Sequence, residues 1–534
     1  MFKKILFCFL GILTYSYANN LIDTEKRRDE QSNFENLIKN KHFDVQKNKE
    51  IAQTEELIVD VNSITLEGNS IFEKFQINSL FKKFIGKNIN IYSLINNLEN
   101  KYIEKGYITT RVGLNMEKSD LEKGKISLFV LEGKIDKIFY DGKENKFKTF
   151  ITFPERENKI LNIRDLDQGI DNLADSSTMD IKASTEESYS NIFINRKNKV
   201  LNLAINYNDL GQKETGRHRL KYSLNLHNLI GLNESIDFSY QMKMQRQYKD
   251  SDANNFSLNV IVPFKNWNFN YSYDESETFR TIYSLRTKYK SSSETKNESF
   301  GIRKLIYRNE NNKIDFGVKV TLKDSKNYID DIKLTTGSRK LSVLTLDTAY
   351  TGRMGGGLLS SSLSTSFGLK KFGANIDDNE WYREKYSPKA QFRKYNLNIS
   401  WYRPVNKFYY KINLGGQYSK NILYSQEKLG IGDDTTVRGF KDESLQGDKG
   451  FYIRNEIGYK GLQFLEPYIA YDYGRTFNNK IKYEKPATIQ GVSIGLKVYF
   501  KSFEGSISLS KPVDRPSYFE KNKAILYTSL TYRF

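Results

Sequence analysis

The segment TTVRGF (residues 435–440) holds the residue types in the chain that most suggest a specific interaction. In it, Arg438 stands between the β-branched Val437 and the pair Gly439 and Phe440, within a polar stretch rich in glycine. A planar guanidinium can bind a carboxylate through two hydrogen bonds, which a lysine ammonium does not match. Taken alone, the segment also fits an ordinary surface loop.

Asp472 is a charged residue inside a patterned segment, EPYIAYDYGR. Ile469, Tyr471 and Tyr473 alternate there with Tyr468, Ala470, Asp472 and Gly474. If the tyrosines face lipid, Asp472 faces the inside of a barrel. The simpler explanation is a solvated carboxylate, of which every barrel lumen has many.

Catalytic chemistry has little support. The three histidines, His42, His218 and His227, lie in unrelated contexts, and Cys8 is the single cysteine. We find no nucleophile elbow, phosphate-binding loop or metal-ligand spacing. The sequence therefore predicts neither an enzyme nor a metal or other cofactor.

The region that must position Arg438 and Asp472 consists almost entirely of alternating strands. In residues 267–274 (WNFNYSYD), for example, aromatic side chains face one way and Asn, Ser and Asp the other. Such runs have about 9–12 residues, the length that a tilted transmembrane strand needs. About sixteen of them follow residue 208, with separate strands expected near 266 and 278, and an even number lets a barrel close without a free edge.

The N-terminal residues are typical of an exported protein. Lys3 and Lys4 precede a short apolar run, and Ser16 and Ala18 fit signal-peptidase cleavage after residue 18. The net charge of +19 is spread along the chain without a basic cluster, which favours solvated lumen and loops over binding of nucleic acid or anionic lipid. Residues 19–56 are highly charged and predict a helix followed by a linker, or a solvated tail.

Residues 57–207 contain a weak internal repeat. A strand and turn at residues 61–68 recur at 135–142, and each copy is followed by a helical pattern and then by further strands, 125–133 and 198–207. The helical positions are Leu94, Ile95, Leu98 and Tyr102 in the first copy and Ile163, Leu166, Ile170 and Leu173 in the second. We predict two α+β modules, 57–133 and 134–207, ahead of a barrel over 208–534.

These pieces together resemble one family, the outer-membrane transporters of two-partner secretion, also known as the haemolysin-activator and filamentous-haemagglutinin-exporter group. The resemblance covers the mature chain and rests on residues 107–114, 125–135, 161–184, 216–240, 435–440, 447–457 and 467–476. It implies two periplasmic POTRA domains and a sixteen-stranded antiparallel barrel in the outer membrane of a Gram-negative bacterium. It further implies that residues near 22–40 form a plug helix in the pore.

The resemblance assigns roles to the site residues. In the family, the arginine of the sixth extracellular loop folds into the barrel and meets an aspartate of the wall, which here pairs Arg438 with Asp472, two residues before Gly474. Val437, Gly439 and Phe440 complete the loop motif, with Gly439 for a tight turn and Phe440 as an anchor. We expect a wet lumen to give this ion pair a strength between that of exposed and buried pairs, so that the loop rearranges during transport.

The chain ends in LYTSLTYRF, whose alternate residues, including Tyr532 and Phe534, predict an assembly signal on a last lipid-facing strand. The implied partners are a large secreted β-helical protein (an adhesin, haemolysin or toxin), outer-membrane lipids, the barrel-assembly machinery and periplasmic chaperones, and the transporter acts as a monomer. Two other functions stay open: an assembly factor that inserts other barrels, and a passive porin.

Overall fold

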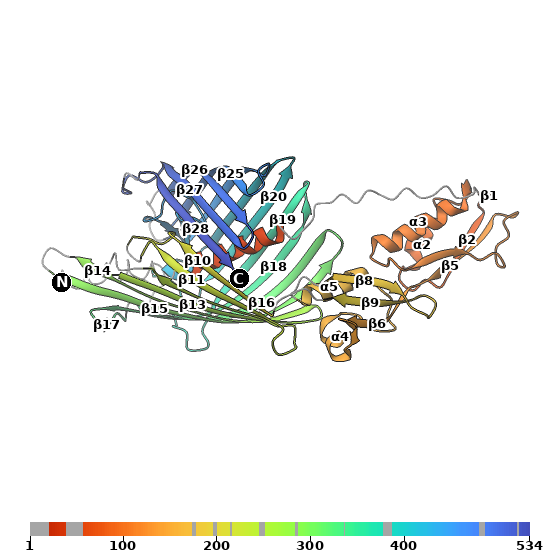
Figure 1. Cartoon of the computed structure of the whole chain (residues 1–534), viewed down its shortest axis with the longest axis horizontal. Helices are drawn as coiled ribbons and strands as arrows, with labels where there is room; N and C mark the ends of the chain where they lie inside the picture. Colours follow the sequence, from red (N-terminus) through yellow and green to blue (C-terminus); the bar gives the residue numbers. More distant parts are fainter. Residues whose placement is uncertain are drawn as a thin grey trace.

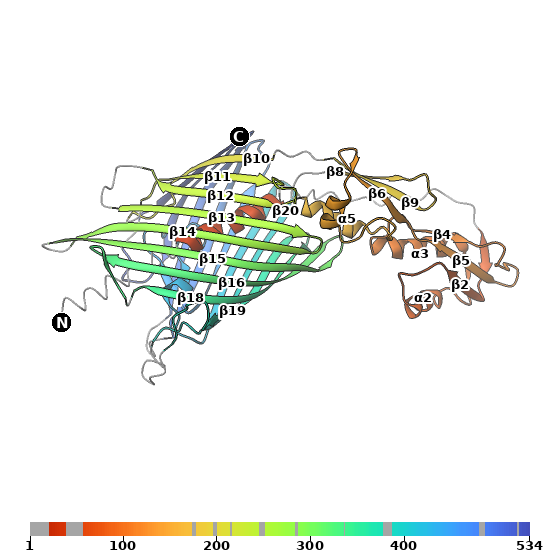
Figure 2. The same ribbon diagram turned by 90° about the horizontal axis from the view of Figure 1, so that it is seen from below.

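The computed structural model describes residues 21–38, 57–173, 178–195, 200–213, 216–244, 251–283, 287–335, 337–377, 387–479, 486–520 and 523–534. Figures 1 and 2 show a barrel, two small modules in a row at one end of it, and a short helix inside it. The predicted signal peptide, the linker and His42 lie outside the described residues. No helix among those described is long and apolar enough to cross a membrane.

The first module packs two helices on a small sheet. The sheet has the order β2-β5-β4, with a separate pair β1-β3 beside it. Asn90 caps α3 through its side chain, and the predicted positions Leu94, Leu98 and Tyr102 are fully buried against this sheet. The elements are β1 (Ile58–Asp60), β2 (Ser63–Glu67), α2 (Lys74–Phe81), β3 (Asn88–Asn90), α3 (Ile91–Glu104), β4 (Arg111–Leu114) and β5 (Lys125–Leu131).

The second module repeats the plan with a sheet of order β7-β6-β9-β8. Leu166 and Leu173, at predicted helical positions, are buried in its core beside Phe153, and Asn162 caps α5. The elements are β6 (Lys134–Tyr140), β7 (Lys143–Glu144), α4 (Lys146–Thr152), α5 (Ile163–Asn172), β8 (Thr178–Ala183) and β9 (Tyr189–Asn195).

Sixteen antiparallel strands close the barrel, and the two-residue β17 (Ile332–Lys333) only extends β16 as a hairpin. The first strand pairs with the last, from Ala204 opposite Arg533 to Asn208 opposite Ser529. The strands are β10 (Leu201–Asn208), β11 (Arg219–His227), β12 (Ser235–Lys243), β13 (Ser251–Phe264), β14 (Trp267–Tyr283), β15 (Lys288–Arg308), β16 (Asn312–Ile329), β18 (Arg339–Met354), β19 (Gly357–Leu369), β20 (Arg393–Val405), β21 (Phe408–Ser419), β24 (Lys449–Tyr459), β25 (Leu465–Phe477), β26 (Ala487–Phe500), β27 (Phe503–Asp514) and β28 (Ile525–Arg533).

Two strand predictions are wrong. The predicted number of strands is still sixteen, because one error omits a strand and the other divides one strand into two. Residues 198–207 were expected in the second module, but β10 belongs to the barrel, where it pairs with both β11 and β28. The separate strands near 266 and 278 are one strand, β14, which stays paired with β15 over its whole length. The charged residues in the middle of β14 hid its continuity, because they resemble a loop.

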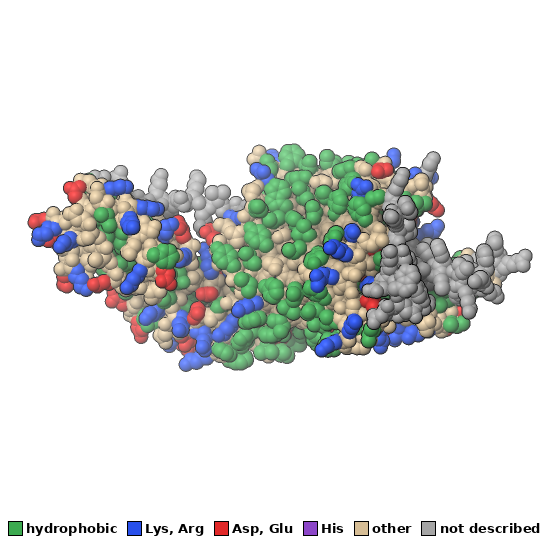
Figure 3. All heavy atoms as spheres, turned by 180° about the vertical axis from the view of Figure 1, so that it is seen from behind, with side chains coloured by type: hydrophobic (Ala, Val, Ile, Leu, Met, Phe, Trp, Pro, Cys, Tyr) green, Lys and Arg blue, Asp and Glu red, His purple; other side chains and the backbone are tan. Residues whose placement is uncertain are grey.

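The wall alternates as predicted. In β25, Ile469 and Tyr471 are exposed on the outside, whereas Asp472 is buried inside. Figure 3 shows hydrophobic side chains gathered over a broad area of the barrel wall, in contrast to the mixed charges of the modules. This is the pattern of a barrel with a lipid-facing surface.

The helix over residues 21–38 lies in the lumen (Figures 1 and 2). Its side chains bond to strands from opposite parts of the wall, including Lys221 of β11, Asp274 of β14, Lys411 of β21 and Lys497 of β26. Phe34, with Leu37 and Ile38, packs on a cluster of wall residues, Leu358, Tyr402 and Tyr409. A solvated tail is therefore wrong for residues 21–38.

Candidate functional site

The loop between β21 and β24 folds back into the barrel. It contains a 3₁₀ turn (Ser425–Glu427) and a short hairpin of β22 (Leu429–Ile431) and β23 (Leu445–Gly447). The motif 437–440 lies between these two strands. Gly439 has a φ of +101°, which a residue with a side chain rarely adopts, so the sharp turn after Arg438 depends on glycine.

Arg438 and Asp472 form a bidentate ion pair. The guanidinium Nε and Nη2 donate to the two carboxylate oxygens over 2.6 and 2.7 Å, and the backbone N–H of Arg438 donates to Oδ2 over 3.0 Å. Both side chains are buried. The expectation of a wet pair is wrong, because loop and wall exclude solvent from it.

Two wall glycines allow the loop to lie this close. A Cβ at Gly491 of β26 would stand 2.0 Å from the carbonyl oxygen of Arg438. A Cβ at Gly474 would stand 2.8 Å from the methyl carbons of Ile431 and Val437. Gly474, predicted from the D-x-G pattern, therefore makes room for the loop, and sequence reasoning missed Gly491.

Apolar packing adds to the ion pair. Val437 and Phe440 are fully buried in a cluster with Ile431, Tyr452 and Ile489, and the ring of Phe440 stands at 61° to that of Phe519, with 6.1 Å between their centroids. The wall thus holds the loop by packing as well as by charge.

The ion pair continues into a network that the sequence did not reveal. Arg438 Nη1 lies 3.3 Å from Glu456, whose other oxygen receives a hydrogen bond from Lys497 over 2.7 Å. Lys497 also lies 3.7 Å from Glu35 of the lumen helix, which pairs with Lys411. The alternation of β24 and β26 places Glu456 and Lys497 inside, but only the fold brings them together.

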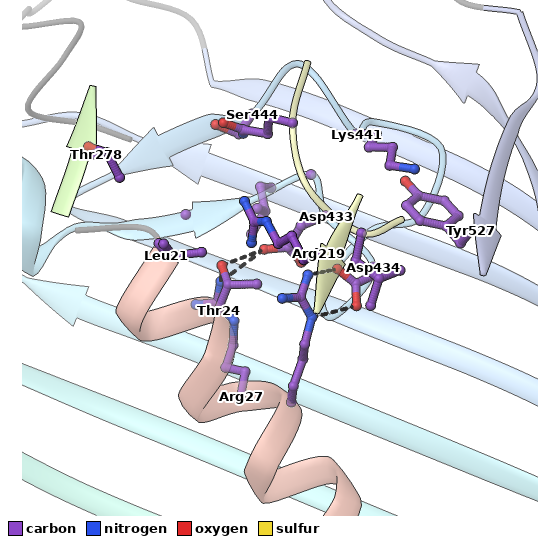
Figure 4. A pocket seen from close by; sticks show the side chains of 16 residues that line it. Leu21, Thr24, Arg27, Arg219, Thr278, Asp433, Asp434, Lys441, Ser444 and Tyr527 are labelled. Atoms are coloured by element: carbon purple, nitrogen blue, oxygen red, sulfur yellow. Dashed lines mark hydrogen bonds and ion pairs between the residues drawn. The ribbon is translucent and has the colours of Figure 1, made fainter. Parts of the chain in front are cut away.

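The other half of the helix contacts the loop directly (Figure 4). Arg27 pairs with Asp433 over 3.0 Å, and Arg28 donates from Nε to Asp434 over 2.9 Å. Arg27 also donates a hydrogen bond to the hydroxyl of Thr435, three residues before Arg438. Two arginines in the helix and two aspartates in the loop were visible in the sequence, but nothing there linked segments some 400 residues apart.

The last strand also meets the loop. The N–H of Gly439 donates to the Tyr527 hydroxyl over 3.1 Å, and Lys441 pairs with Asp209, just after β10, over 3.0 Å. On the opposite face of this strand, Tyr532 is exposed on the barrel exterior, as is the terminal Phe534. From inside the barrel, the loop therefore contacts the last strand, β28, and the residue that follows the first strand, β10.

No group of three acidic, histidine or cysteine side chains that could hold a metal ion occurs within the described parts of the chain. His218 stacks on Tyr207 and shares a hydrogen bond with its hydroxyl. The site can therefore hold two segments in the lumen, the loop that contains Arg438 and the helix over residues 21–38, by ion pairs and apolar packing.

Two α+β modules ahead of a closed sixteen-stranded barrel, with a loop and a helix inside, define a POTRA-plus-barrel outer-membrane protein. Comparison with known families narrows this class. The family model "Haemolysin secretion/activation protein ShlB/FhaC/HecB" matches residues 188–498, and two POTRA models match residues 59–133 and 134–184. The chain belongs to this family: it is an outer-membrane transporter of two-partner secretion, with POTRA domains in the periplasm.

Individual relatives agree. The chain is 28% identical over 412 residues to the outer membrane transporter CdiB of Dickeya dadantii (75% of this chain, 73% of the relative). It is 25% identical over 405 residues to the hemolysin transporter HpmB of Proteus mirabilis (72% and 70%). The solved structure of CdiB from Escherichia coli has the same fold, with a TM-score of 0.87 and 24% identity over 97% of this chain and 98% of that one. The family decides against the assembly factor and the porin.

Proposed function

We propose that this transporter exports one large secreted β-helical protein in an extended state, with the helix over residues 21–38 as the plug of the resting pore. The observation that carries the proposal is the position of this helix across the lumen, attached by ion pairs to the wall and to the loop. Members of the family export large partner proteins such as haemolysins and toxins. The cargo would be an adhesin, a haemolysin or a toxin.

The POTRA domains, for which we propose the boundaries 57–133 and 134–195, would receive the partner before it enters the pore. In the sheet of the second domain, β8 pairs with β9 on one side, and no described strand pairs with its other side. An extended segment could add to such an edge through its main chain. Holding the partner there would raise its effective concentration at the pore.

The loop residues Val437, Arg438, Gly439 and Phe440 would keep the loop on the wall at Asp472 and Gly474 while the helix moves. The contacts of the loop are buried and include apolar packing, whereas the helix is held largely by ion pairs, with apolar packing of Phe34, Leu37 and Ile38 near one end. Release of the helix would open a path along the lumen.

Other features of the proposal concern assembly and energy. Tyr532 and Phe534 would present the last strand to the barrel-assembly machinery after periplasmic chaperones deliver the chain, and one chain closes the barrel, which fits a monomer. We assign no catalytic activity. Folding of the partner outside the cell would drive export, because the periplasm lacks ATP.

Co-expression with the partner tests the proposal. The neighbouring genes are searched for a very large repetitive secreted protein as the candidate partner, and the amount of that protein in the medium is the readout. Deletion of residues 57–133 should leave a heat-modifiable barrel in the outer membrane and abolish secretion. Unchanged secretion by this variant would show that the first POTRA domain does not receive the partner.

A further inference from the structure

The helix α4 of the second POTRA domain carries two phenylalanines on its outer side. Phe147 is 60% exposed and Phe150 39% exposed, whereas Lys148, Thr149, Ile151 and Thr152 are buried between the domain and the barrel turns. This orientation reverses the usual order, in which aromatic side chains are buried and lysines are exposed. The exposed aromatic side therefore needs a partner outside the domain.

The helix α4 packs against a turn of the barrel. The N–H of Lys265, in the turn between β13 and β14, donates to the carbonyl of Ile151, and the ring of Phe150 packs edge-on against Phe264 at 5.7 Å. Phe264 is the last residue of the outward-facing row Leu258, Val260 and Val262 in β13 and pairs with Trp267. The helix thus touches the barrel where its lipid-facing surface ends (Figure 1).

A second barrel turn extends the same rim. In the turn between β11 and β12, Leu229 is 58% and Ile230 67% exposed. This turn is fixed to α4 by a hydrogen bond of 2.7 Å from Asn233 to Thr152. Three neighbouring chain segments, joined by hydrogen bonds, therefore expose apolar side chains at the POTRA end of the barrel.

Basic side chains frame this apolar rim. Lys265 Nζ lies 4.8 Å from the ring centroid of Phe150, and Arg156 lies over the same ring at 5.1 Å. On the barrel, Lys304 Nζ lies 4.8 Å from the centroid of Trp267. Aromatic rings mixed with cations are typical of the membrane–water interface, where rings enter the lipid and cations meet anionic headgroups.

We propose that the outer side of α4, with Phe147, Phe150, Leu229 and Ile230, is inserted in the phospholipid leaflet that faces the periplasm. The second POTRA domain is then held against the membrane as well as against the barrel turns. This lipid contact would fix the direction in which the edge strand β8 presents a partner to the pore. The inference concerns lipid binding by the domain and does not depend on the proposed export path.

Spin labels test the insertion in the full-length protein. In a Cys8→Ser background, one variant carries Phe147→Cys and a second carries Ile230→Cys. Phe75→Cys in α2 is the matched control, because Phe75 is 70% exposed on the first POTRA domain, beyond the second from the barrel (Figure 2). Each labelled protein is placed in nanodiscs of three parts phosphatidylethanolamine and one part phosphatidylglycerol.

Insertion predicts a severalfold higher ratio of oxygen to nickel-complex accessibility at positions 147 and 230 than at position 75. Heat-modifiability on gels verifies that each variant has a folded barrel. Equal ratios at 147 and 75 would overturn the proposal. Protection of position 147 only after addition of the secreted partner would also overturn it, because a protein would then be the occupant.

Discussion

The loop motif and the lumen helix lie beside each other in the barrel, yet they are held differently. The Arg438 and Asp472 side chains are 4% and 0% exposed, and fully buried Val437 and Phe440 support them. The pairs that attach the helix are less buried: Arg27 and Asp433 are 20% and 25% exposed, Arg28 and Asp434 are 16% exposed each, and Lys26 is 43% exposed. Breaking a buried pair by removing one partner costs about 3–5 kcal/mol, whereas exposed pairs contribute about 0–1 kcal/mol.

This difference teaches which segment is suited to move. The helix is held mostly by partly exposed ion pairs, with apolar packing around Phe34 near one end. Such a segment can exchange its ion pairs for water and counter-ions one at a time, at a lower cost than a fully buried pair. A segment held by a dry bidentate pair and apolar packing cannot. We therefore propose that the loop stays on the wall while the helix leaves, in place of the rearranging loop that the sequence led us to expect.

Removal of the loop arginine should have the largest effect. Arg438→Ala would leave Asp472 buried without its cation, and a cost of about 3 kcal/mol shifts the loop equilibrium about a hundredfold. We expect an assembled, heat-modifiable barrel and almost no secreted partner. Arg438→Lys, which keeps the charge but loses the bidentate geometry, should secrete an amount of partner between those of the wild type and the alanine variant. Secretion at the wild-type level by the alanine variant would contradict the role of the pair.

Gly491→Ala should have the next largest effect. The added methyl group would meet the backbone carbonyl of Arg438, so the loop must move away from the wall and secretion should drop. Gly416→Ala is the matched control, because there the nearest atom to the added carbon is 3.8 Å away and the side chain fits without displacement. The account fails here if both variants secrete alike.

The double variant Arg27→Ala with Arg28→Ala should have a smaller effect of opposite sign. Loss of two partly exposed pairs, up to about 2 kcal/mol together, would raise the fraction of open pores up to about thirtyfold in planar bilayers. Partner secretion should persist, because the loop stays in place. Lys26→Ala, which removes a single contact to Asp274, is the control and should open the pore less. An unchanged conductance in the double variant would exclude these pairs as the closing contacts.

The sequence allowed more of this architecture to be predicted than of the site. Alternation alone placed Asp472 on the inner face, and helical spacing placed Leu94 and Leu166 in the POTRA cores, because these patterns are local. The link of Arg27 and Arg28 to Asp433 and Asp434 joins opposite ends of the chain, so no local pattern contains it. The same is true of Glu456 and Lys497. The burial of the Arg438 ion pair depends on how the loop packs against the wall, which no local pattern in the sequence contains.

Chemical cross-links test most directly whether the helix moves while the loop stays. In a Cys8→Ser background, cysteines at positions 28 and 434 are joined by a reducible bis-maleimide linker, which ties the helix to the loop. Cysteines at 441 and 209 tie the loop to the residue that follows β10. The account predicts that the first link stops secretion until reduction restores it, while the second leaves secretion close to that of the same variant without linker. Secretion that continues with the helix tied, or stops with only the loop tied, would contradict it.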